Sequence, residues 1–148
     1  MPSIVPSYIY TLFASILIGA LLICMCGVST VNMKSKAETQ QLVNVAEYVA
    51  AQSNELILHA IRDNANSSVH LNVPSTIGNQ KYWIQIANDS SKVWVEAGFG
   101  SALNYSEQKA YIPCKVSTSG VYTSFSGIAI LECQTDSSGI YLSIKGVN

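Results

Sequence analysis

The hydrophobic positions of this chain follow one pattern in its first part and another in its second. Residues 4–33 are almost all apolar or small. After a short polar stretch, apolar residues return at the 3.6-residue spacing of a helix face. These positions are Leu42, Val43, Val45, Ala46, Val49, Ala50, Leu56, Ile57, Ala60 and Ile61. Neither Gly nor Pro occurs at 28–61. We therefore expect one helix over about 6–63, roughly 85 Å long, with Pro6 in its first turn.

Beyond this helix the pattern changes to that of short strands. Two runs of β-branched and aromatic residues flank a turn-rich tetrapeptide at 88–91, which predicts a β-hairpin. Later Ile and Leu residues alternate with period 2, as in a sheet with one buried face. Strands are expected at 81–87, 92–97, 110–116, 121–125, 127–133 and 139–145, with turns at 117–120 and 135–139. The fold class is α+β, with a helical region at 1–64 and a small antiparallel β-domain at 65–148.

The helical region itself has two parts. Residues 34–64 are amphipathic and can pack on the β-domain. Residues 1–33 contain no Asp, Glu, Lys, Arg or His, so either lipid or other copies of the chain must bury them. The side chains expected at such a polymerisation interface are Tyr8, Ile9, Leu12, Phe13, Ile16, Leu17, Gly19, Leu21, Leu22 and Ile23, among which the small Ala14, Ser15, Gly19 and Ala20 let helices approach closely.

Composition and charge exclude several classes of function. The net charge is −1 and only 11% of residues are charged, which gives no electrostatic case for a nucleic-acid partner. No nucleophile elbow, phosphate-binding glycine loop or His-x-x-x-His occurs, and His59 and His70 fit no metal-ligand spacing. We therefore expect no enzyme and no catalytic, cofactor or metal site. Trp83, Trp94 and Tyr82 fit sheet packing better than a sugar-binding face.

The cysteines fall into two pairs. Cys24 and Cys26 lie two apart in the apolar helix, on different faces, and are expected to be small buried hydrophobes. Cys114 and Cys133 lie in two predicted strands, where a disulfide would stabilise a small domain. Two buried free thiols are the alternative.

Three Asn-x-Ser sequons, at Asn66, Asn88 and Asn104, fall in predicted loops or turns and are candidate glycosylation sites. With the disulfide and the low-charge polar surface, they favour an extracellular β-domain. Lys34 and Lys36 follow the apolar segment and would favour the opposite orientation by the positive-inside rule. A basic leader that once preceded this chain and was removed would resolve the conflict.

The run Pro-Ser-Tyr-Ile-Tyr-Thr-Leu-Phe-Ala-Ser-Ile-Leu-Ile-Gly-Ala-Leu-Leu-Ile, residues 6–23, resembles archaeal members of the type IV pilin superfamily, which includes archaeal flagellins. The resemblance covers the first 60 residues; the β-domain matches only in kind. Bacterial pilins usually carry a glutamate at the fifth mature position, where this chain has Val5, and no acid precedes Glu38. The resemblance therefore points to the archaeal branch, and it implies a β-sandwich-like domain, leader removal by a prepilin peptidase and assembly by a membrane machine.

The expected function is that of a pilin. The chain would insert in the membrane, then polymerise through its hydrophobic helix into an extracellular type IV pilus-like filament, with the β-domain outside, serving surface adhesion. The alternative is a monomeric, single-pass, membrane-anchored surface or binding protein that uses the same segment only as an anchor.

Overall fold

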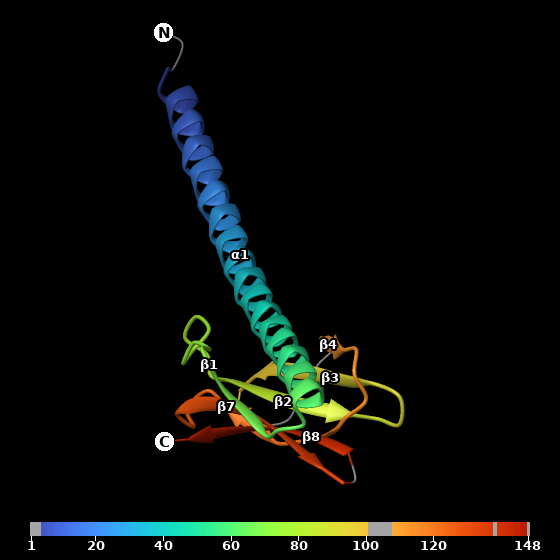
Figure 1. Ribbon diagram of the computed structural model, residues 1–148. Coiled ribbons are helices and arrows are strands. Elements are labelled where there is room, and N and C mark those ends of the chain that lie inside the picture. Colours follow the sequence, from blue (N-terminus) through green and yellow to red (C-terminus); the bar gives the residue numbers. More distant parts are fainter. Residues whose placement is uncertain (1–3, 101–107, 138, 148) are drawn as a thin grey trace. The chain divides into compact units, whose positions relative to one another are not determined.

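One helix and eight strands make up the part of the chain that this computed structural model describes, residues 4–100, 108–137 and 139–147 (Figure 1). The elements are α1 (Ile4–Asp63), β1 (Ser67–Leu71), β2 (Tyr82–Asn88), β3 (Val93–Phe99), β4 (Lys109–Ile112), β5 (Ser117–Ser119), β6 (Val121–Thr123), β7 (Ile128–Asp136) and β8 (Gly139–Val147). The chain divides into two units, Met1–Ala37 and Glu38–Asn148. We call the second the tail unit. The α+β fold class is confirmed.

The single long helix is confirmed, and it begins two residues earlier than expected, at Ile4. Pro6 is compatible with this start because the first-turn N–H groups have no intrahelical partner in any case. The β-branched stretch after Gly27 stays helical, with the hydroxyls of Ser29 and Thr30 donating to carbonyls one turn earlier. The helix ends where Asn64 takes the left-handed conformation, φ 47°, which Asn tolerates better than most residues.

The strands form two four-stranded sheets, in the orders β1-β7-β8-β5 and β4-β3-β2-β6. Neighbouring strands are antiparallel except for β5, which runs parallel to β8. Buried residues of both sheets belong to one hydrophobic cluster. In the first sheet the register places Leu131 beside Val69 and Ile144, on its buried face. The predicted antiparallel domain is thus two sheets around a shared core.

Several strand predictions need correction. The segment 117–120 was expected to be a turn, but Ser117–Ser119 is strand β5. Strand β1 was not expected, and the predicted strand at 110–116 ends already at Ile112. Strand β7 runs on to Asp136, which shortens the expected turn before β8. Segments rich in Ser and Thr have a composition typical of turns. Here the segment is a strand because a neighbouring strand pairs with it.

Strands β5 and β6 belong to different sheets and are separated by one residue, Gly120. Its φ of 104° is a conformation that residues with a Cβ rarely adopt. A Cβ at this position would also lie 2.2 Å from the carbonyl oxygen of Ile144. The direct crossing between the sheets therefore requires glycine.

We expect Gly120→Ala to lower the free energy of unfolding of the tail unit by about 2–4 kcal/mol, because it combines backbone strain with a backbone clash. Gly139→Ala is the matched control. Gly139 also has a positive φ, 130°, but nothing lies within 4 Å of its Cβ position. Urea unfolding followed by tryptophan fluorescence measures both. Equal losses would show that the approach to Ile144 does not matter.

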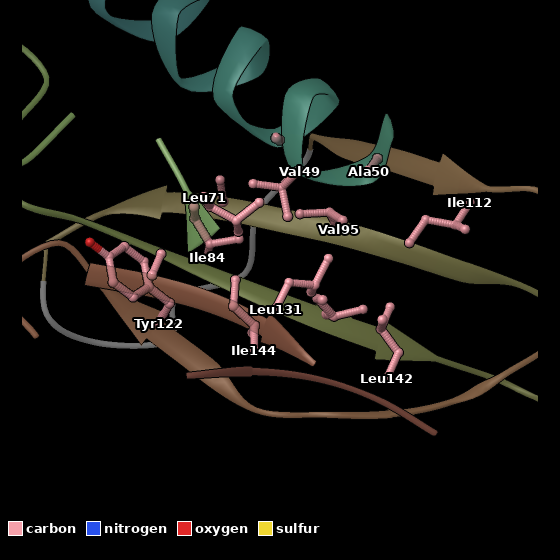
Figure 2. Packing of buried hydrophobic residues seen from close by; sticks show 14 of the residues in the cluster. Val49, Ala50, Leu71, Ile84, Val95, Ile112, Tyr122, Leu131, Leu142 and Ile144 are labelled. Atoms are coloured by element: carbon pink, nitrogen blue, oxygen red, sulfur yellow. The ribbon is translucent and has the colours of Figure 1, made fainter. Parts of the chain in front are cut away.

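The tail-unit part of α1 packs on the sheets through one face, as predicted. Figure 2 shows Val49 and Ala50 of the helix in the same cluster as Val95 of one sheet and Leu131 of the other. The buried residues of the helix are Leu42, Ala46, Val49, Ala50, Ser53, Leu56, Ile57 and Ala60. The predicted face was too wide, because Ile61 is 57% exposed and Val43 and Val45 are only half-buried. The buried hydroxyl of Ser53 donates to the Val49 carbonyl at 2.7 Å.

The loop after β1 returns to the start of this helical part. The side chain of Ile77 is buried, and the side-chain amide of Gln80 donates to the Glu38 carboxylate at 3.1 Å. A Cβ on Gly78 would lie 2.1 Å from the same carboxylate. The loop thereby closes over the first residue of the tail unit.

Candidate polymerisation surface

Residues 8–33 of α1, which we call the apolar segment, leave their large side chains exposed on every side of the helix. Exposed fractions run from 50% at Leu17 to 75% at Ile23. The predicted interface residues Tyr8, Ile9, Leu12, Phe13, Ile16, Leu17, Leu21, Leu22 and Ile23 are all in this exposed set. Gly19 is half-buried by its own helix, and its Cβ position has no atom within 4 Å. The structure thus brings the predicted interface residues onto one helix surface without covering them.

The serine and threonine hydroxyls within the segment donate to carbonyls of the helix itself. Thr11 donates to the Tyr8 carbonyl at 2.9 Å, and Ser15 donates to the Thr11 carbonyl at 2.8 Å. Ser29 and Thr30 make the equivalent bonds, both at 2.9 Å. A hydroxyl moved from water into an apolar environment costs free energy unless it is hydrogen-bonded. These bonds make the four serine and threonine positions compatible with dry surroundings.

The area left exposed is large in energetic terms. Burying one Leu, Ile or Phe side chain contributes about 1.5–3 kcal/mol. The exposed side chains of the segment together then contribute more than about 10 kcal/mol before ordering costs. By length and composition α1 is apolar enough to cross a membrane. The segment therefore requires either lipid or a protein partner.

A row of small residues runs along the apolar segment, one residue at every fourth position. Thr11, Ser15 and Gly19 lie on one side of the helix, and Thr11 and Ser15 line a shallow depression together with Tyr8, Leu12 and Ile16. Small residues in such a row let the backbones of two helices approach closely. The row is the part of this surface that would allow a second helix the closest backbone approach.

The cysteines differ from expectation in both pairs. Cys24 and Cys26 are exposed on the helix rather than buried. Cys114 and Cys133 are free thiols, so the expected disulfide is absent from the structure. The Cys114 thiol donates to the Asn54 side chain of α1 at 3.5 Å. Cys114 lies beyond the end of β4, whereas Cys133 lies in β7, where burial raises the pKa of its thiol. Both thiols are unpaired, but only Cys133 is buried, since Cys114 is half-buried.

Two of the three sequon asparagines are described, and both are exposed. The side-chain oxygen of Asn66 accepts the Thr135 backbone N–H at 2.9 Å, and that of Asn88 accepts the Thr118 hydroxyl at 3.0 Å. A glycan is attached through the amide nitrogen, so both bonds are compatible with modification. Asn104 lies outside the described residues. Glycosylation stays a prediction.

Of the three aromatic residues considered as a sugar-binding face, Tyr82 and Trp83 are buried in the domain. Tyr82 is fully buried, and its hydroxyl donates to the Pro74 carbonyl. Trp83 is buried against Gly98, its cross-strand neighbour, where a Cβ would lie 2.6 Å from the indole ring. Trp94 alone is half-buried on the solvent face of its sheet. There it lies 6.4 Å from the ring of Tyr111, centroid to centroid.

Burial raises the pKa of the Tyr82 phenol, and the neighbouring Tyr122 adds to this effect. A raised folded pKa means that stability is full below the unfolded tyrosine pKa, about 10, and is lost as the pH rises above it. We expect the urea midpoint of the tail unit to fall above about pH 10 and to fall less steeply in Tyr82→Phe.

Part of the alkaline loss is expected to persist in Tyr82→Phe, because burial also raises the pKa of Tyr122. Tyr111→Phe, which alters an exposed ring, is the control and should keep the wild-type pH profile. If the urea midpoint of Tyr82→Phe depended on pH as that of the wild type does, Tyr82 would not be a cause of the alkaline loss of stability.

Tyr111 was not among the residues predicted from the sequence; it lies two positions after Lys109 in β4. These two residues lie opposite Trp94 and Glu96 of β3. The sequence did contain a signal for this pairing, since each strand carries an aromatic residue two positions from a charged residue, and the two charges are opposite in sign.

No family model, curated protein or solved structure matches this chain.

Proposed function

We propose that this chain is the structural subunit of an extracellular type IV pilus-like filament. Copies polymerise through the apolar segment, which forms the dry filament core, and the tail units face the solvent. The observation that carries the proposal is the apolar segment itself, exposed on all sides and free of charge, on the same helix as a folded tail unit. The resemblance of residues 6–23 to archaeal type IV pilins supports the same assignment.

Lipid and neighbouring copies hide apolar area about equally well, so area alone does not drive subunits from the membrane into a filament. The row of Thr11, Ser15 and Gly19 gives protein packing an advantage, because close backbone approach adds dispersion contacts that fluid lipid does not match. Before assembly the segment lies in the membrane, and a prepilin peptidase and a dedicated assembly machine act there. Surface adhesion is the role of the finished filament.

The competing function is a monomeric membrane-anchored surface protein, since α1 meets the requirements of a membrane span. The two functions differ only in what buries the apolar segment. Filaments sheared from the cell surface and purified in the absence of detergent are expected to contain this chain as their main component by mass spectrometry. Recovery of the chain only from detergent-extracted membranes, as a monomer, would contradict the filament.

A further inference from the structure

A shallow depression lies at the end of β4, on the surface of the tail unit. Its lining includes Ser91, Lys92, Tyr111, Pro113 and Lys115, and we call it the Tyr111 depression. The ring of Tyr111 is 59% exposed there. The depression combines an accessible aromatic ring, two lysines and a hydroxyl in one place.

The Tyr111 ring is held in position by its neighbours. Trp94 packs against it at an interplanar angle of 59°, and the Lys92 ammonium lies 5.6 Å from its centroid. Trp94 is fixed in turn, because its indole N–H donates to Glu96 at 2.6 Å and the Lys109 ammonium lies 4.2 Å from its ring centroid. An aromatic ring supported in this way loses little conformational freedom when a ligand covers it.

The charge of the depression is positive although the chain as a whole carries −1. Its lining contains two lysines and no carboxylate. Three acids lie around it. Glu47 lines a neighbouring depression that also includes Tyr111 and Pro113. Asp89 accepts the backbone N–H groups of Ser91 and Lys92, both at 2.7 Å, and these bonds, together with the charge of Lys92, lower the pKa of its carboxyl. Glu96 pairs with Lys109 at 3.2 Å.

We propose that the Tyr111 depression binds an acidic polysaccharide. A sugar ring stacks on the exposed face of Tyr111, and its carboxylates pair with Lys92 and Lys115. The C–H face of a pyranose complements an aromatic face, and the carboxylates complement the two ammonium groups. A neutral polysaccharide supplies only the first of these contacts, and an acidic peptide supplies only the second. The shallow, open shape also suits a sugar chain that passes across the surface.

The use of this site in adhesion rests on the proposed filament. A filament would repeat the depression once per subunit, so a long polysaccharide would engage many copies at once. Linked sites of low affinity then give strong overall attachment without any further contact. Binding to a single chain does not depend on polymerisation, and the two ideas can fail separately.

The test measures binding of polygalacturonate, dextran and poly-L-glutamate to the full chain in detergent micelles. We expect polygalacturonate to bind best and to be weakened at high salt, which shortens the screening length. Tyr111→Ala is expected to reduce binding about tenfold, and the double change Lys92→Gln with Lys115→Gln by a similar factor. Tyr111→Phe keeps the ring and should retain binding.

Tyr141→Ala and Lys145→Gln are matched controls, because both alter exposed residues of β8 in the other sheet and should leave binding unchanged. Circular dichroism confirms that each variant is folded. Equal binding of poly-L-glutamate or of dextran would overturn the acidic polysaccharide as ligand. Unchanged binding in the Tyr111 and lysine variants would overturn the site. If the chain binds polygalacturonate in micelles but no filaments that contain it are found on cells, only the proposed filament is contradicted. If filaments are found but bind no polygalacturonate, only this inference is contradicted.

Discussion

Leu17→Asp and Gly19→Leu are each expected to abolish filaments while the tail unit stays folded. Leu17 is half exposed in the apolar segment, and a carboxylate placed there would have to be buried without a partner in a packed core. Gly19 has open space around its Cβ position in the single chain, but a leucine there would hold a neighbouring helix away from the row of small residues. Electron microscopy of sheared surface material measures the loss.

The two variants separate assembly from membrane insertion. An Asp in the middle of a membrane-spanning helix costs about 3 kcal/mol on insertion scales, so Leu17→Asp weakens both steps. Gly19→Leu is apolar and leaves insertion intact, so its chain should accumulate in the membrane fraction without filaments. Leu17→Met, which conserves volume and polarity, should assemble normally. Normal filaments from both Leu17→Asp and Gly19→Leu would show that the segment is only an anchor.

In the tail unit, Ile57→Ala is expected to lower the free energy of unfolding by about 3 kcal/mol, as buried Ile-to-Ala changes generally do. Ile57 is fully buried in the cluster that joins the helix to the sheets. Ile61 lies one turn further along the same helix but is 57% exposed. Ile61→Ala should therefore change stability by no more than about 0.5 kcal/mol.

Urea unfolding of the fragment 38–148, followed by tryptophan fluorescence, compares the two isoleucine variants without any filament contacts. Similar losses in both would mean that the helix packs on the sheets through a different face. No cooperative transition in the unmodified fragment would mean that the tail unit needs the apolar segment to fold.

The helix and its buried face were predictable because their signals are local. Period 3.6 and the absence of Gly and Pro at 28–61 predict the second half of the helix, and these features lie within a few turns of one another. The width of the buried face was not predictable, since Ile57 and Ile61 have the same residue type and differ only in what lies beside them. Their difference arises from the sheets, which are formed by residues far along the chain.

The strand errors have the same origin. Ser117–Ser119 has the composition of a turn and becomes β5 only because β8, more than twenty residues later, pairs with it. The Tyr111 depression also depends on strand register, since the pairing of β3 with β4 places Trp94 opposite Tyr111. Sequence reasoning without a register can identify an aromatic residue and a lysine, but it cannot determine that they meet. Cys114 and Cys133 were expected to pair, but the structure places Cys114 beyond the end of β4 and Cys133 within β7, with both thiols free.

The internal hydrogen bonds of Thr11, Ser15, Ser29 and Thr30 have a consequence for how subunits discriminate between one another. Hydroxyls that donate to their own helix are not available to donate to a neighbouring helix. The apolar segment can therefore select a partner by shape complementarity, but it has few polar groups that would be left without a hydrogen bond beside a different helix. In a cell that makes two chains with similar apolar helices, the segments alone would allow mixed fibres. In the proposed filament, fidelity of copolymerisation would then come from the tail units, which carry most of the charged side chains of the chain.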